Sequence, residues 1–241
     1  MKTKAYSKPR VGLYSTGLAA YWAQFPSLHD RLVSYNEFIA EKMSQWGEVY
    51  NFGLVDTVDK GIEAGKYFNE HNVDIIFLHA ATYATSATVL PIHQHCQAKV
   101  VMLNLQPSDR VNYEKTSTGE WLAHCNACPV PEFANAFHRA GIPYKVISGL
   151  LGLEKTPAVS VANETTCNRP EAIRAWKEIS EWIRAAQVKN TLSESRFGFL
   201  GNTYSGMLDM YSDFTMLQAQ AGIQLEVLEM CDLDALLKTV T

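Results

Sequence analysis

Four polar side chains follow two short apolar runs and are the first candidates for binding chemistry. The runs are Ile75–Leu78 and Val100–Leu105, and the polar residues are His79, Tyr83, Asn104 and Gln106. Runs that are apolar on every face are typical of buried parallel strands, and ligands of such sheets bind at the carboxyl ends of the strands. We therefore predict a crevice here. Two interpretations of His79 stay open: it caps a strand end through a backbone hydrogen bond, or it contacts a ligand.

Cysteines and histidines are the next candidates, because they could bind a metal or carry redox chemistry. Cys125 and Cys128 form a C-x-x-C pair, and His93, His95 and Cys96 stand close together in sequence. A structural zinc site needs four ligands and is usually built from two paired spacings, and no second pair is present. Five cysteines in scattered positions also do not suggest a secreted disulfide scaffold. We expect ordinary buried thiols, with a C-x-x-C thiol protein as a minor alternative.

Strand and helix patterns alternate through residues 1–152 and predict one domain. Strands are expected at 10–18, 49–55, 75–78, 100–105 and 144–148, with helices between them and a polar loop at 108–119 beside the crevice. Repeated alternation of this kind is the signature of a Rossmann-like, doubly wound parallel sheet. The glycine fingerprint G-x-G-x-x-G is absent after the first strand, so a dinucleotide would have no phosphate cradle.

The pattern changes after residue 152. Residues 153–195 are predicted to form a connector and a long crossing helix, which carries an apolar stripe at Ile173, Trp176, Ile179, Trp182 and Ile183. The strand–helix rhythm begins again at Arg196, so residues 196–241 are expected to start a second α/β domain. So few elements cannot bury the faces of a sheet, which leads us to expect a fragment of a longer protein.

Hydrophobic content and net charge exclude some classes of binding partner. The 241 residues are 47% hydrophobic and 19% charged, with a net charge of -4 and no basic stripe. This balance suits a packed globular protein and argues against a nucleic-acid partner. No run approaches the roughly 18 apolar residues of a membrane helix, and no apolar signal core follows the N-terminus. We therefore expect no membrane partner and a cytoplasmic location.

Five segments in succession resemble the N-terminal half of the arabinose/fucose isomerase family of sugar isomerases. They are VGLYSTGLAAYW (11–22), LHAATYATSA (78–87), LNLQ (103–106), RFGFLGNTYSGMLDM (196–210) and GIQLEVLEMCDL (222–233). No single segment is diagnostic, but their order and spacing match over nearly the whole chain. The family interconverts aldoses and ketoses with a bound divalent ion, typically Mn²⁺, through an enediol proton transfer. The catalytic and metal-binding residues of the family come from a later domain. The resemblance therefore implies that this chain has no catalytic residues, no metal ligands and no bound ion.

The resemblance also implies which residues contact the monosaccharide. By position these are Leu18, Ala20, Tyr21, Tyr83, Gln106 and Tyr204. Tyr83, Gln106 and Tyr204 could instead be aromatic and amide groups packed at strand ends. The turn at 18–21 would reach the site of a neighbouring subunit in a homo-oligomer, a trimer or hexamer. Arabinose isomerases carry Gln and His in that turn, whereas this chain has Leu18 and Ala19, which argues against arabinose itself as the substrate.

A binding module is the alternative to an enzyme. Two Rossmann-like lobes joined by a crossing segment also resemble cytoplasmic sugar-binding or sugar-sensing proteins. For the isomerase, the isolated chain is expected to be inactive, because the groups that transfer the proton lie elsewhere.

Overall fold

The computed structural model describes residues 8–157, 165–200, 206 and 212–240. Contacts divide the chain into two compact units, and the division falls within one long helix, between Arg184 and Ala185. None of the described helices is long and apolar enough to cross a bilayer.

The first unit is built on a five-stranded parallel sheet. Its strands are β1 (Arg10–Thr16), β2 (Glu48–Val55), β3 (Ile75–His79), β4 (Lys99–Gln106) and β5 (Tyr144–Leu150), in the spatial order β2-β1-β3-β4-β5. Every neighbouring pair is parallel. The structure thus confirms the predicted doubly wound α/β fold.

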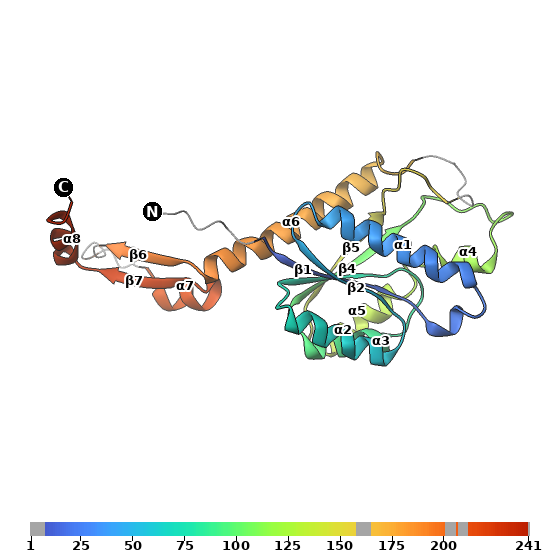
Figure 1. Ribbon diagram of the computed structural model, residues 1–241, viewed down its shortest axis with the longest axis horizontal. Coiled ribbons are helices and arrows are strands. Elements are labelled where there is room, and N and C mark those ends of the chain that lie inside the picture. Colours follow the sequence, from blue (N-terminus) through green and yellow to red (C-terminus); the bar gives the residue numbers. More distant parts are fainter. Residues whose placement is uncertain (1–7, 158–164, 201–205, 207–211, 241) are drawn as a thin grey trace. The chain divides into compact units, whose positions relative to one another are not determined.

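Helices cover both faces of this sheet (Figure 1). They are α1 (Pro26–Met43), α2 (Val58–Glu70), α3 (Ser86–His95), α5 (Val130–Arg139) and α6 (Pro170–Ser193). Within the first unit, α1 and the start of α6 lie on one face, while α2, α3 and α5 lie on the other. A short helix, α4 (Thr118–Leu122), follows the loop after β4; it was not predicted from the sequence.

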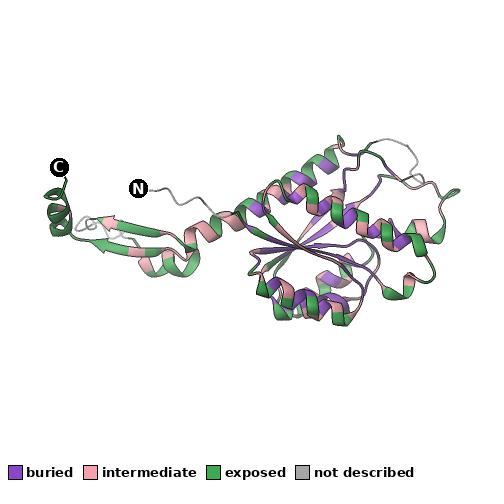
Figure 2. Ribbon diagram, viewed as in Figure 1, coloured by how far each residue is buried: buried purple, intermediate pink, exposed green. Residues whose placement is uncertain are grey.

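The core lies between the sheet and the helices, and Figure 2 shows the central strands as the most buried elements. All five residues of β3 are buried, as expected for a strand covered on both faces. On the α2, α3 and α5 side, the core includes Phe68, Ile92, Phe133 and Phe137, all fully buried. Burying aromatic side chains of this size is a main source of the stability of such a core.

Close packing of α2 on α3 depends on a glycine. A Cβ at Gly61 would fall well inside van der Waals contact of the Thr88 carbonyl oxygen, and one at Gly65 would lie 2.8 Å from the Cβ of His95. Because the obstacle at Gly61 is backbone, it cannot move aside by a rotamer change. The two helices therefore approach at a distance that only glycine allows.

The second unit comprises the end of α6, β6 (Arg196–Leu200), α7 (Phe214–Ala221), β7 (Gln224–Leu228) and α8 (Met230–Leu237). β6 and β7 pair in parallel. None of the described residues of these two strands and two helices is buried. A two-stranded sheet offers too little surface for a core of its own, which explains the exposed Phe197, Val227 and Met230.

Gly61→Ala is expected to lower the free energy of unfolding of the first unit by about 1 to 3 kcal/mol, because overpacking outweighs the gain in helix propensity. Urea unfolding would measure this. Glu63→Ala, at an exposed position of the same helix, is the control and should change stability by less than about 0.5 kcal/mol. A Gly61→Ala protein as stable as the parent would show that α2 and α3 do not pack this closely.

Candidate functional site

The topology of the sheet places the candidate site at one edge. The chain leaves β1 for β2 on one side and then crosses to β3 on the other side of β1. The connections after β1 and β3 therefore diverge, and sheets of this topology commonly bind ligands between such connections, at the carboxyl ends of the strands. Ser15 and His79 are register partners at this position.

A hydrogen-bonded network of buried polar side chains lies beneath the carboxyl ends of β1 and β3. The Ser15 hydroxyl lies 3.0 Å from Nδ1 of His79 and accepts a 2.8 Å hydrogen bond from the Asn36 amide. Asn36 in turn accepts a 2.6 Å bond from the amide of Asn51 on β2. The Ser15 hydroxyl can donate to Nδ1 of a His79 ring protonated at Nε2, or accept from a ring protonated at Nδ1, because a hydroxyl has one donor and two acceptor sites.

His79 is part of this hydrogen-bonded network, and the interpretation of His79 as a backbone cap needs correction. Its side chain is fully buried, and its partner is the Ser15 side chain rather than the backbone. Burial lowers the pKa of His79 to about 3, so the ring is neutral at physiological pH. No described residue offers a hydrogen bond to its Nε2.

The turn after β1 is held firmly on the end of β2. Gly17 N donates to the Val55 carbonyl at 2.9 Å, and the Trp22 indole donates to the Asp56 carboxylate at 2.7 Å. A Cβ at Gly17 would lie 2.8 Å from the Trp22 ring, so glycine is required for this arrangement. Asp56 is buried and also pairs with Lys60 at 2.8 Å.

This turn presents three of the predicted substrate-binding residues at the surface. Leu18 and Tyr21 are half-buried and Ala20 is exposed. Burial raises the pKa of Tyr21, and the nearby Tyr83 phenol raises it further, so the structure brings these two tyrosines together. Tyr204, the last predicted residue, lies outside the residues that the structure describes.

A pocket of about 390 Å³ lies between the start of α1 and α4, and an ion pair forms part of its wall. The Arg31 guanidinium binds both carboxylate oxygens of Glu120, with Nη2 at 2.7 Å from Oε1. The hydrogen bond from Arg31 holds the pKa of Glu120 below its ordinary value. The pair fixes α4 against α1, and a bidentate geometry of this kind is the stronger form of ion pair.

A second pocket, of about 430 Å³, opens at the carboxyl end of β4, and we call it the β4 pocket. It is lined by Gln106, Ser108, Asp109, Arg110, Val111, Tyr113, Trp121 and His124. Its wall thus combines an amide, an acid–base pair, an imidazole and two exposed aromatic rings. The predicted site residue Gln106 is in this wall, and the predicted crevice-side loop supplies most of the rest.

Hydrogen bonds fix the side chains of the β4 pocket. The Gln106 amide donates to Asn104 at 3.3 Å, and Asn104 donates to Ser148 on β5 at 3.2 Å. His124 Nδ1 lies 2.8 Å from the Glu120 carbonyl oxygen, so Nδ1 carries the proton and Nε2 is the acceptor. Burial lowers the pKa of His124, against the opposing effects of that hydrogen bond and of the Glu120 charge. Nε2 of His124 is buried and has no hydrogen-bond partner among the described residues, so the fixed Gln106 amide is the group suited to the recognition of hydroxyl groups.

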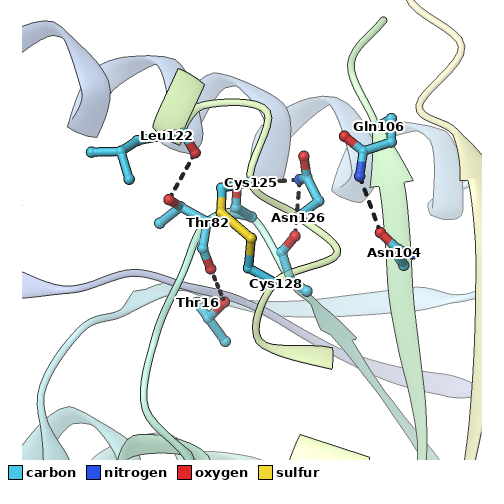
Figure 3. The surroundings of a disulfide bond; sticks show 10 residues. Thr16, Thr82, Asn104, Gln106, Leu122, Cys125, Asn126 and Cys128 are labelled. Atoms are coloured by element: carbon cyan, nitrogen blue, oxygen red, sulfur yellow. Dashed lines mark hydrogen bonds between the residues drawn. A yellow bond between two sulfur atoms is a disulfide. The ribbon is translucent and has the colours of Figure 1, made fainter. Parts of the chain in front are cut away.

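Cys125 and Cys128 form a disulfide bond, which corrects the expectation of ordinary thiols. Figure 3 shows this bond beside the end of β3. Asn126, between the cysteines, is fully buried and donates to the carbonyl oxygens of Ala80 at 2.9 Å and Ala81 at 3.2 Å. Cys96 and Cys167 are free, as is the exposed Cys231.

Two further findings concern metal binding and similarity to known proteins. No group of three or more His, Cys, Asp or Glu side chains in the described ranges could hold a metal ion. Comparison with models of known protein families and with curated proteins finds no match.

Sequence reasoning missed Trp121 and His124 in the β4 pocket and Ser15, Asn36 and Asn51 beneath the carboxyl ends of β1 and β3. Asn36 stands in a helix beside the buried Tyr35, and its amide on an otherwise apolar face was the only sequence signal for a buried polar chain.

Glu120→Gln is expected to lower the free energy of unfolding by about 1 kcal/mol at pH 7. Because the folded-state pKa of Glu120 lies below its ordinary value of 4.5, the stabilisation is complete above pH 4.5 and is lost as the pH falls through the folded-state pKa. The difference between parent and variant in chemical unfolding should therefore shrink below pH 4.5. Glu114→Gln, at an exposed position of the preceding loop, is the control. A difference that persists unchanged at pH 3 would rule out the ion pair as its cause.

Proposed function

We propose that this chain is the N-terminal part of a metal-dependent aldose–ketose isomerase and that it forms one wall of a monosaccharide pocket. The β4 pocket is the observation that carries the proposal. Its volume of about 430 Å³ lies in the range of small-molecule sites, and its wall suits a polyol. Aromatic rings can cover the C–H faces of a sugar, while the Gln106 amide, Asp109 and Arg110 can pair with its hydroxyl groups.

The resemblance to the arabinose/fucose isomerase family supports the choice of reaction. In this proposal a divalent ion, Mn²⁺ in the first instance, would supply Lewis-acid chemistry to the complete protein. The described residues do not fit such an ion, since no cluster of suitable ligands is found among them. We therefore assign the metal ligands and the proton-transferring groups to a further domain. The role of this chain is to bind and orient the sugar.

The turn at residues 18–21 supports a proposal about assembly. Ala20 is exposed and Leu18 and Tyr21 are partly exposed, and neither pocket described above is lined by them. We propose that they complete the site of a neighbouring subunit in a cytoplasmic homo-oligomer, a trimer or hexamer. Tyr83, beside Tyr21, would contribute to the same contact.

A cytoplasmic sugar-binding or sugar-sensing module is the second candidate. The specific observation that favours it is that the β4 pocket is built entirely from residues 106–124 of the first unit. A pocket made by one unit can bind a ligand without the metal-bearing domain. Binding of a sugar without Mn²⁺ and without turnover would favour this candidate.

The test of the isomerase is ketose formation by the complete protein with Mn²⁺ and a panel of pentoses, hexoses and deoxyhexoses. We expect one aldose–ketose pair to be interconverted. Gln106→Ala should raise KM for that sugar about tenfold with little change in kcat, because the amide binds the substrate and transfers no proton. Ile173→Ala, exposed on α6, is the control and should behave as the parent. Absence of turnover across the panel, or an unchanged KM in Gln106→Ala, would contradict the proposal.

A further inference from the structure

The segment formed by α4 and the loop that follows it carries both the disulfide and part of the β4 pocket. Trp121 in α4 and His124 in the loop line the pocket, and Cys125 follows directly. The loop is docked on the end of β3 by side-chain hydrogen bonds: Asn126 donates to the carbonyl oxygens of Ala80 and Ala81, and the Thr82 hydroxyl donates to the Leu122 carbonyl at 2.8 Å. Figure 3 shows these contacts on either side of the disulfide. The position of this pocket wall therefore depends on the conformation of residues 122–128.

The disulfide restrains that conformation. It closes a ring over a separation of three residues, with Asn126 inside the ring. Opening the ring frees backbone conformations that the closed ring excludes, and the cost of holding Asn126 against β3 rises accordingly. The contacts at Ala80 and Ala81 are then no longer enforced by a covalent link.

The two cysteines differ in burial. Cys128 is an exposed residue, whereas Cys125 is 4% exposed. Attack by a small thiolate from the side of Cys128 makes the buried Cys125 the leaving group. An exchangeable disulfide needs such a difference between its two cysteines.

We propose that the Cys125–Cys128 disulfide is a reversible redox control of the β4 pocket, with a low-molecular-weight thiol such as glutathione as its reductant. A glutathione thiolate attacks Sγ of Cys128, the Cys125–Cys128 bond breaks, and Cys125 leaves as a thiolate that takes a proton. A second glutathione attacks the mixed disulfide, releasing Cys128 as a thiol and glutathione disulfide. The protein gains two electrons and two protons, and two glutathiones are oxidised. In the reduced protein, Asn126 releases the end of β3 and the wall at Trp121 and His124 loosens.

The regulatory meaning of this switch rests on the proposed function of the β4 pocket, but its test needs no sugar. Amide hydrogen exchange is measured by mass spectrometry on the ligand-free chain, equilibrated in glutathione buffers of graded ratio, with alkylation counting the free thiols. We expect the pair to pass from disulfide to dithiol within the series. Exchange at residues 80–84 and 122–128 should then be about tenfold faster in the reduced form, as for a local opening.

Two variants separate the redox event from its consequence. Asn126→Ala keeps the disulfide and should show the fast exchange even when oxidised, because its contacts to β3 are gone. Cys125→Ser/Cys128→Ser should show the fast exchange at every glutathione ratio. The amides of α5 serve as the internal control and should not change. Equal exchange in the oxidised and reduced forms would overturn the proposal, as would a pair that stays reduced when glutathione disulfide dominates. A clear change in exchange, together with no sugar turnover by the complete protein, would overturn the proposed function and leave the switch standing.

Discussion

The parallel pairing of β1 with β3 is the constraint on which the rest of the structure depends. It joins strands that are separated in sequence by β2, so the chain must diverge at their carboxyl ends. Ser15 and His79, a buried and neutral polar pair, are in contact across the carboxyl ends of β1 and β3. Burying a polar group without a hydrogen bond costs free energy. The hydrogen bonds that link Asn51, Asn36 and Ser15 therefore favour one arrangement of β2, α1 and β1.

The segments at this end of the sheet carry the candidate binding groups. Asp56 anchors the turn after β1, and the Arg31–Glu120 ion pair anchors α4. The Cys125–Cys128 loop is anchored by Asn126 on the end of β3. Each anchor acts on a loop or a short helix near the surface, where binding groups are commonly found. The sheet is thus a rigid base, and the proposed binding groups are held on it by a few polar contacts.

The sequence was sufficient to predict the fold class. Apolar runs and their polar ends predicted the parallel strands, and Gln106 does line a pocket at such an end. The partner of His79 could not be predicted, because Ser15 is 64 residues away and meets it only through strand register. Trp121 and His124 were missed for a similar reason: α4 is held by a contact between residues 89 positions apart. The C-x-x-C spacing allowed a disulfide, but it could not show that Asn126 ties the pair to β3.

We propose that this chain binds a small polyol at the carboxyl edge of the sheet, in the β4 pocket. The most direct measurement is NMR chemical-shift mapping of the isotope-labelled chain during titration with the panel of monosaccharides. We expect saturable shifts at Gln106, the Trp121 indole and His124 with at least one sugar, and none at Lys99 and Gly141 at the opposite edge. Shifts confined to the opposite edge, or no saturable shift with any sugar, would contradict it.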